Sequence, residues 1–177
     1  MVIEIREINQ STLQNVNQVD GSFLVDSRLI LTAVDGHIQY TIEPVPSYTK
    51  TYDIEPLDYQ TFIDNPNKTI LFAYADDEVA GQIILRVNWN KFAYVEDIAV
   101  DLSFRRLGVG GLLMSRAIDW AREKNLPGIM LETQDINVPA CRFYERCGFV
   151  MAGFDRLLYK ATLPGSEEIA LYWYLIF

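Results

Sequence analysis

Histidine and cysteine are scarce in this chain of 177 residues, which contains only His37, Cys141 and Cys147. One histidine cannot assemble a His-based metal site, so no metal is expected. A Ser-His-Asp or Cys-His nucleophile would depend on His37, in a segment without a nucleophile motif. The two cysteines lie in one predicted helix and cannot pair without breaking it, so we expect buried free thiols.

Long apolar runs and a basic leader are also missing. The run from Ile169 to Phe177 is too short to span a bilayer, and no basic segment precedes an apolar one at the N-terminus. We therefore expect a cytoplasmic protein. Fifteen basic residues against twenty-four acidic ones give a net charge of −9, which argues against nucleic acid or an anionic membrane as partner. An excess of negative charge would attract a cationic substrate. The alternative explanation is that the charge only keeps the protein soluble.

The residues that are present predict one domain, 1–177, with a single core and an α/β (α+β) fold. Helices are expected at 109–124 and after the cap Asn137, with shorter ones at 11–16 and 58–64. Residues 44–56, with Pro44, Pro46 and Pro56, are expected to form an irregular loop. Strands, antiparallel at first and later crossed over by helices, are expected at 2–8, 23–32, 37–42, 69–75, 79–89, 92–100, 128–134, 149–154 and 169–177.

The most informative segment is Val95–Asp101 followed by Arg105–Gly111, which predicts a strand, a tight turn and a helix. Glycines at the turn let a ligand approach the backbone, and the N–H groups at the helix start favour phosphate. The glycine pattern R-x-x-G-x-G matches neither a P-loop nor a Rossmann fingerprint. Glycines also serve plain tight turns, so this segment alone leaves the ligand open.

A second motif, N-x-x-A-x-x-F-Y-E-x-x-G-F, runs from Asn137 to Phe149. Together the two segments resemble the signatures of the GNAT superfamily of N-acetyltransferases, and the likeness covers about residues 69–155. It implies a GNAT-like mixed, centrally splayed sheet flanked by helices, with residues 1–65 as a variable part that faces substrate. Within the family, the strand from Tyr94, the tyrosine-rich loop before residue 60 and the C-terminal Tyr-Trp-Tyr are most similar to the bacterial streptothricin acetyltransferases.

This resemblance implies acetyl-CoA as co-substrate and no metal. The pyrophosphate would lie on the turn, and the pantetheine arm would run along the preceding strand as a neighbouring strand would. Asn137 would contact the cofactor arm or act as a plain helix cap. The implied cofactor-binding residues are Ile98, Ala99, Val100, Arg105, Arg106, Leu107, Gly108, Val109, Gly110, Gly111 and Asn137.

The chemistry requires a base for the amine and a donor for the leaving thiolate. The family pattern makes Tyr144 the general acid, and a core tyrosine is the alternative. We favour Glu96 as base, acting through water, because strict alternation places it on the strand face of Tyr94 and Ile98. Asp97 would point to the other face unless a bulge intervenes. Either carboxylate could instead bind the substrate's ammonium group.

The predicted function is acetylation of a primary amine of a cationic small molecule, the β-lysine amine of streptothricin in the favoured case, conferring antibiotic resistance. Alternatives are a polyamine, amino acid or protein amine as substrate, or a non-catalytic acyl-CoA-binding sensor. Half of the C-terminal strand could line a pocket or a homodimer contact. Candidates for the substrate wall are Tyr48, Tyr52, Trp89 and Tyr94, which could stack on a cation, and Asp53, Glu55, Asp76 and Asp77, which could pair with one.

Overall fold

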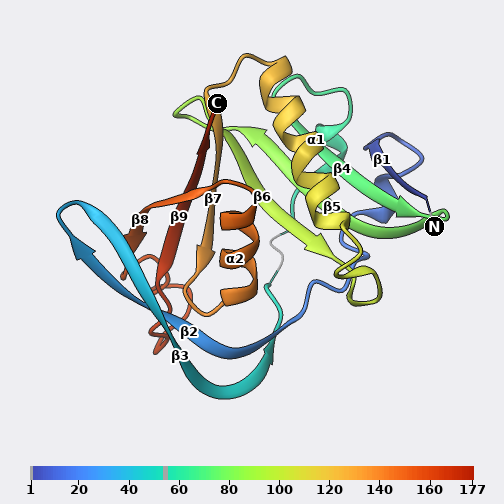
Figure 1. Cartoon of the computed structure of the whole chain (residues 1–177). Coiled ribbons are helices and arrows are strands. Elements are labelled where there is room, and N and C mark those ends of the chain that lie inside the picture. Colours follow the sequence, from blue (N-terminus) through green and yellow to red (C-terminus); the bar gives the residue numbers. More distant parts are fainter. Residues whose placement is uncertain (1, 54–55) are drawn as a thin grey trace. The chain divides into compact units, whose positions relative to one another are not determined.

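The computed structural model describes residues 2–53 and 56–177, so Glu55 lies outside the described residues. The fold is mixed α/β, with two α-helices among the described residues (Figure 1). The chain forms two compact units. The first unit comprises the described residues of 1–22, 51–129 and 177, and the second comprises residues 23–50 and 130–176. None of the described helices is both long and apolar enough to cross a membrane.

The first unit contains four antiparallel strands in the order β1-β4-β5-β6. Their bounds are Ile3–Glu7, Lys68–Ala75, Glu78–Val87 and Ala93–Val100. One face of this sheet packs on the turns at Leu13–Asn15 and Tyr59–Phe62. The core on that face consists of Ile8, Phe62, Ile70, Phe72, Tyr74 and Ile84.

Helix α1 (Val109–Glu123) packs on the same four strands (Figure 1). Its apolar residues recur at helical spacing and are buried, as the sequence predicts. Helix α1 and strand β5 approach each other closely at Gly81. A Cβ atom there would lie 2.9 Å from the carbonyl oxygen of Ala99 and 3.1 Å from side-chain atoms of Val109 and Leu113. Only glycine therefore lets the start of α1 lie this close to β5 and β6.

The second unit combines a long hairpin with three strands of the seven-stranded sheet. Strands β2 (Phe23–Val34) and β3 (His37–Lys50) pair with each other around Asp35-Gly36. Both turn residues have positive φ, at 50° and 77°, as the two-residue turn requires. The strands β7 (Gly128–Gln134), β9 (Ala170–Ile176) and β8 (Val150–Asp155) follow in that order across the sheet. Helix α2 (Val138–Arg146) packs against β2.

A buried ion pair joins the hairpin to the end of β7. The Asp135 side chain is fully buried, and its Oδ2 accepts from Nη2 and Nε of Arg28 at 2.5 and 3.0 Å. The other carboxylate oxygen accepts from the Ile169 N–H at 2.9 Å. All the charge of Asp135 is thus met by donors within the second unit, which identifies it as structural.

Three predictions about local structure were wrong. Residues 44–50 belong to β3 and not to a loop, because the hairpin is a separate two-stranded sheet in which each strand is an edge. An edge strand tolerates Pro44 and Pro46, which lack an N–H, and the register of the pair shifts between Val25 and Ser27, where Pro44 is paired. The short helices expected at 11–16 and 58–64 are single 3₁₀ turns.

Candidate active site

Strand β6 contains a bulge at Glu96. Ile84 of β5 pairs with Asp97, whereas the next residue of β5, Leu85, pairs with Val95, so Glu96 is an extra residue. The bulge interrupts the alternation on which the sequence prediction relied. Glu96 and Asp97 therefore point to the same face of the sheet, and Ile98 points to the other. The expectation that Glu96 and Ile98 share a face was wrong for this reason.

Glu96 is held by a cation. Its Oε1 accepts from Nε of Arg86 at 2.5 Å, and the Arg86 guanidinium also lies over the Tyr94 ring, 4.6 Å from its centroid. Asn88 accepts from the same guanidinium at 2.6 Å. The Glu96 side chain is one quarter exposed. Its negative charge is thus largely balanced before any substrate arrives.

Asp97 is held by an amide. Gln82, which is 1 % exposed, donates to Asp97 Oδ2 at 2.8 Å and to Asn17 Oδ1 at 2.8 Å. The Asn17 backbone N–H in turn donates to Gln82 Oε1 at 2.8 Å, which fixes the amide's orientation. Burial raises the pKa of Asp97, and the Gln82 hydrogen bond opposes that rise only in part. No salt bridge among the described residues involves Asp97.

The turn before α1 is open toward its surroundings. Arg106 and Gly108 adopt left-handed backbone conformations with φ of 63° and 88°. Gly108 caps α1 without a side-chain hydrogen bond, no acidic residue lies in the first turn, and nothing lies within 4 Å of a Cβ placed on Gly108 or Gly111. The N–H groups at this helix start are thus unscreened donors in a partial positive field, a fit for phosphate.

Arg105 holds this turn in place. Its Nη2 donates to the carbonyl oxygens of Ser22 at 2.6 Å and Asp20 at 3.4 Å, and its Nε donates to the Val100 carbonyl at 3.0 Å. These contacts tie the end of β6 to the N-terminal segment. The Arg105 guanidinium is therefore already engaged by backbone, which leaves Arg106, exposed at the turn, as the freer cation.

The second unit holds the residues of the second motif. Tyr144 is 6 % exposed, and its ring lies 5.9 Å from that of Phe149 and 6.2 Å from that of Trp173. Asn137 is the N-cap of α2, and its side chain accepts from the Ala140 N–H at 3.3 Å. The capping role considered for Asn137 is confirmed. Cys141 and Cys147 are both free thiols, and burial raises the pKa of Cys141 to about 12.

A carboxylate that the sequence analysis missed lies on β7. Glu132 accepts a hydrogen bond from the Tyr159 hydroxyl, and burial raises its pKa to about 7. The pKa of Tyr172 is also raised, first by burial of its hydroxyl and then by the nearby charges of Glu132 and Asp155. The signal was a lone charged residue inside the apolar run Gly128–Gln134, which a search for motifs does not detect.

The residues proposed for the substrate wall differ in exposure and in partners. Trp89 is 87 % exposed, Asp77 pairs with Arg6 at 3.4 Å, and Tyr94 lies under Arg86. Tyr48 belongs to the second unit, in β3. Among residues 2–53 and 56–177, no group of three or more His, Cys, Asp or Glu side chains is placed to hold a metal ion.

The first unit holds a strand with a bulge and a glycine turn at the start of α1, and the second unit holds the motif tyrosine. Residues 38–149 match the model of the Acetyltransferase (GNAT) family. The chain belongs to this family and is an acetyl-CoA-dependent N-acetyltransferase. The fold and recognition predictions are thereby confirmed.

Relatives and solved structures support this assignment over the full length. The chain is 35 % identical to streptothricin acetyltransferase A of Bacillus subtilis over all of both chains. It also resembles the crystal structure of a proposed streptothricin acetyltransferase from Bacillus anthracis in complex with acetyl coenzyme A, with a TM-score of 0.92, 48 % identity and coverage of 100 % and 98 %. The crystal structure of nourseothricin acetyltransferase matches with a TM-score of 0.82, 31 % identity and 99 % coverage of both chains.

Proposed function

We propose that the protein acetylates a primary amine of streptothricin, on the β-lysine side chain, and thereby confers resistance to the antibiotic. The main support is the full-length similarity to streptothricin acetyltransferase A at 35 % identity. The net charge of −9 suits a cationic substrate, because an acidic surface raises the encounter rate with cations.

The co-substrate, acetyl-CoA, supplies an acetyl group activated as a thioester. The turn that begins α1 would hold its pyrophosphate through the N–H groups from Leu107 to Gly111, with Arg106 as the nearby cation. The support is the open start of α1, which has no side-chain cap and no acidic residue in its first turn. Ile98 to Val100 would pair with the amide-bearing arm as a neighbouring strand does.

For the base we now favour Asp97 over Glu96. A lysine-type amine has a pKa near 10.4 and must lose a proton before it attacks. Asp97 is partly buried, has a raised pKa and is contacted by an amide, so it is the better proton acceptor of the two. Glu96 is tied to Arg86 and would shape the field around the substrate's ammonium group.

Tyr144 is the proposed general acid, which donates a proton to the departing thiolate. Its support is its place in the second motif and its burial in the second unit. A tyrosine hydroxyl retains its proton at neutral pH and can therefore donate it where negative charge develops. Asn137 would then serve chiefly to cap α2 and position this helix.

The experiment that tests the function is CoA release from acetyl-CoA with streptothricin as acceptor, with the mass of the product recorded. Matched acceptors are spermidine, an aminoglycoside and a peptide with a free N-terminus. One added acetyl group on streptothricin, with a kcat/KM at least tenfold above the other amines, supports the proposal. Preferred turnover of another amine would keep the enzyme class and overturn the substrate.

The mechanism is tested separately. Tyr144→Phe is expected to keep acetyl-CoA affinity, measured by calorimetry, and to lose about 10²- to 10⁴-fold in kcat, the usual contribution of a positioned acid. An unchanged kcat would remove Tyr144 from the proton transfer. Gly110→Asp is expected to weaken acetyl-CoA binding by charge and steric conflict, and wild-type affinity there would exclude the proposed phosphate site.

A further inference from the structure

Gln82 of β5 is a buried amide in an otherwise apolar part of the first unit. Its side chain is 1 % exposed, and it is paired with Phe72 of β4, which belongs to the core on that face of the sheet. A polar group in such surroundings costs free energy unless each of its polar atoms is hydrogen-bonded. An apolar residue would pack there without that requirement, so the contacts of Gln82 indicate why an amide is present.

The direction of the Gln82 amide is fixed by Asn17. The Asn17 backbone N–H donates to Gln82 Oε1 at 2.8 Å, and Gln82 Nε2 donates to Asn17 Oδ1 at 2.8 Å. Turning the amide by 180° would place donor against donor and acceptor against acceptor. Asn17 is itself held, because its Nδ2 donates to the Tyr59 hydroxyl at 2.8 Å. The second N–H of Gln82 therefore points at Asp97.

This N–H makes the two carboxylate oxygens of Asp97 unequal. Oδ2 accepts it at 2.8 Å, whereas Oδ1 has no hydrogen-bond donor among the described residues. Asp97 is only partly buried, and Oδ1 is not one of the fully buried side-chain atoms that lack a partner, so solvent reaches this oxygen. A carboxylate that is held at one oxygen and open at the other accepts a proton at one defined atom.

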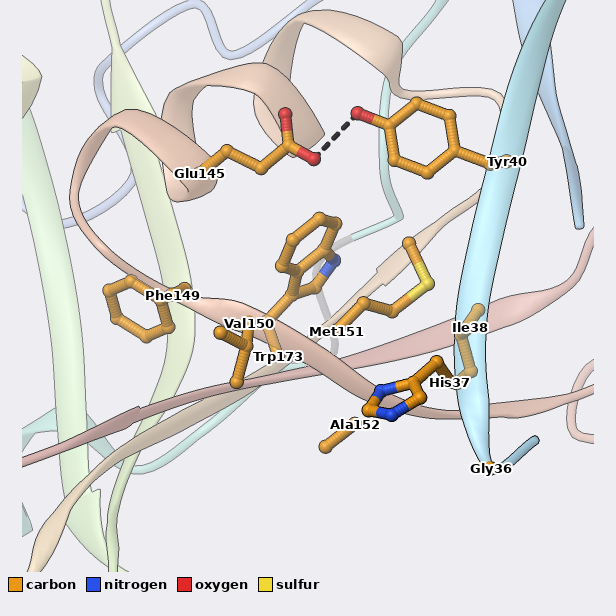
Figure 2. A pocket seen from close by; sticks show the side chains of 10 residues that line it. All are labelled: Gly36, His37, Ile38, Tyr40, Glu145, Phe149, Val150, Met151, Ala152 and Trp173. Carbon is orange, nitrogen blue, oxygen red and sulfur yellow. Dashed lines mark hydrogen bonds between the residues drawn. The ribbon is translucent and has the colours of Figure 1, made fainter. Parts of the chain in front are cut away.

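Glu145 in the second unit is a useful contrast. It lines a cavity, and its Oε1 accepts a hydrogen bond from the Tyr40 hydroxyl at 2.6 Å (Figure 2). Glu145 is exposed, so water solvates its charge with or without the tyrosine. Asp97 is less exposed, and for this reason a single neutral donor has a larger effect on its charged form.

The other ionisable groups near Asp97 already have partners. Glu96, on the same face of the sheet, pairs with Arg86 at 2.5 Å, and Tyr59 joins the network only through its hydroxyl. Burial raises the pKa of Asp97, and the hydrogen bond from Gln82 opposes that rise. Gln82 thus favours the ionised carboxylate, which is the form that accepts a proton.

We propose that Gln82 is a positioning residue for acetyl transfer, which holds Asp97 by Oδ2 and leaves Oδ1 to face the substrate's ammonium group. An ammonium N–H bond breaks, an Oδ1–H bond forms, and the amine keeps the electron pair with which it attacks the thioester carbon. This assignment rests on the proposed function, in which Asp97 is the base. Gln82 touches neither substrate nor acetyl-CoA and acts only through Asp97.

The first test is Gln82→Met, which removes the amide and keeps the length of the side chain. With the best of the four acceptors, kcat at neutral pH should fall about tenfold or more, a part of what a positioned base contributes, while KM for acetyl-CoA stays the same. The acid limb of the kcat profile should move to higher pH, because the pKa of Asp97 rises without its hydrogen bond. ¹³C spectra of the Asp97 carboxyl carbon, assigned with Asp97→Asn, measure that pKa without turnover.

Gln82→Glu is the isosteric variant, and Asn15→Ala is the control. In Gln82→Glu one oxygen still accepts from the Asn17 N–H, but the other meets Asp97. The two carboxyl groups then share a proton, and the acid limb moves higher still. Asn15 donates to the Tyr74 hydroxyl at 2.7 Å, and no hydrogen bond in the described part of the chain joins it to Asp97. Asn15→Ala should keep the wild-type kcat and pH profile.

The double variant Gln82→Met/Asp97→Asn separates positioning from a purely structural role. Because Gln82 acts through Asp97, the double variant should keep the kcat of Asp97→Asn. A further loss of about tenfold would overturn the proposal, as would a Gln82→Met enzyme with the wild-type pH profile. Asp97→Asn with the wild-type kcat would instead remove the base itself, and this assignment with it. A wrong substrate affects none of these results, since the acceptor is chosen by its turnover.

Discussion

Asp97 in the first unit is partly buried and Asp135 in the second is fully buried, and their partners differ. Asp135 faces the Arg28 guanidinium and the Ile169 N–H, so its charge is balanced within the fold. Asp97 faces the neutral amide of Gln82, and burial raises its pKa. Burial costs both residues solvation, and the cation beside Asp135 offsets more of that cost than the amide beside Asp97 does. A buried carboxylate without a cation is therefore the better candidate for chemistry.

The largest effect that this comparison predicts concerns Asp97. Asp97→Asn should lower kcat about 10²- to 10⁴-fold, because it removes the proposed base. The free energy of unfolding should stay the same or rise slightly above neutral pH, since a costly buried charge is removed and the Gln82 hydrogen bond can be kept. Steady-state kinetics and urea unfolding measure the two. The control Glu96→Gln should lose much less kcat; a larger loss there would restore Glu96 as the base.

Asp135 should behave in the opposite way. Asp135→Asn leaves the Arg28 guanidinium without its counter-charge, so we expect a loss of about 3 kcal/mol in the free energy of unfolding. Urea unfolding at neutral pH is the measurement. Acetyl-CoA affinity in the folded fraction should change little. A loss below about 0.5 kcal/mol would show that this pair is not the structural contact that its burial implies.

Glu132 lies between these cases, because its partner is a tyrosine and its pKa is about 7. The folded protein retains a proton between the ordinary pKa of 4.5 and about 7, whereas the unfolded chain releases it. Stability from this residue therefore falls as pH rises through that window. Glu132→Gln should gain about 1 kcal/mol over wild type at pH 8 and almost nothing at pH 4. Urea unfolding at both values checks it, and an equal gain at both would contradict the raised pKa.

The smallest effect is expected at Glu96. Arg86→Met breaks its ion pair, but both side chains retain solvent contact, so the free energy of unfolding should fall by about 0.5 kcal/mol. Thermal unfolding in low and high salt measures this, and the difference from wild type should shrink as salt rises. A loss above about 2 kcal/mol would mean that Glu96 is as structural as Asp135.

Much of the fold was predictable because its signals are local. Strand β7 occurs at Gly128–Gln134 as expected, and α1 and α2 begin where glycine and Asn137 indicate a cap. The strand extension through Pro44 was not predictable, since it depends on β3 being an edge strand of an isolated hairpin. Proline indicates a turn because of its effect on the local backbone, and it carries no information about which strand pairs with that segment.

The candidate site divides in the same way. Tyr144 and Gly108 to Gly111 stand in short motifs, so the sequence indicated them directly. The faces of Glu96 and Asp97 depend on a one-residue bulge, which is set by how β6 aligns with β5. The distinction between the two carboxylates depends on Gln82 and Arg86, which lie on the neighbouring strand. Pairing across strands is the information that a single sequence does not display.

The three carbonyl contacts of Arg105 have a consequence for the kinetics of ligand binding. They bind the turn before α1 to the N-terminal segment in the free protein, so this turn is preorganised. A ligand that settles on it does not have to immobilise a loop, which would otherwise reduce affinity. Association should therefore follow a single concentration-dependent phase, without a slow step of loop closure. In such a site, differences in affinity between acyl-CoA analogues should arise in the dissociation rate.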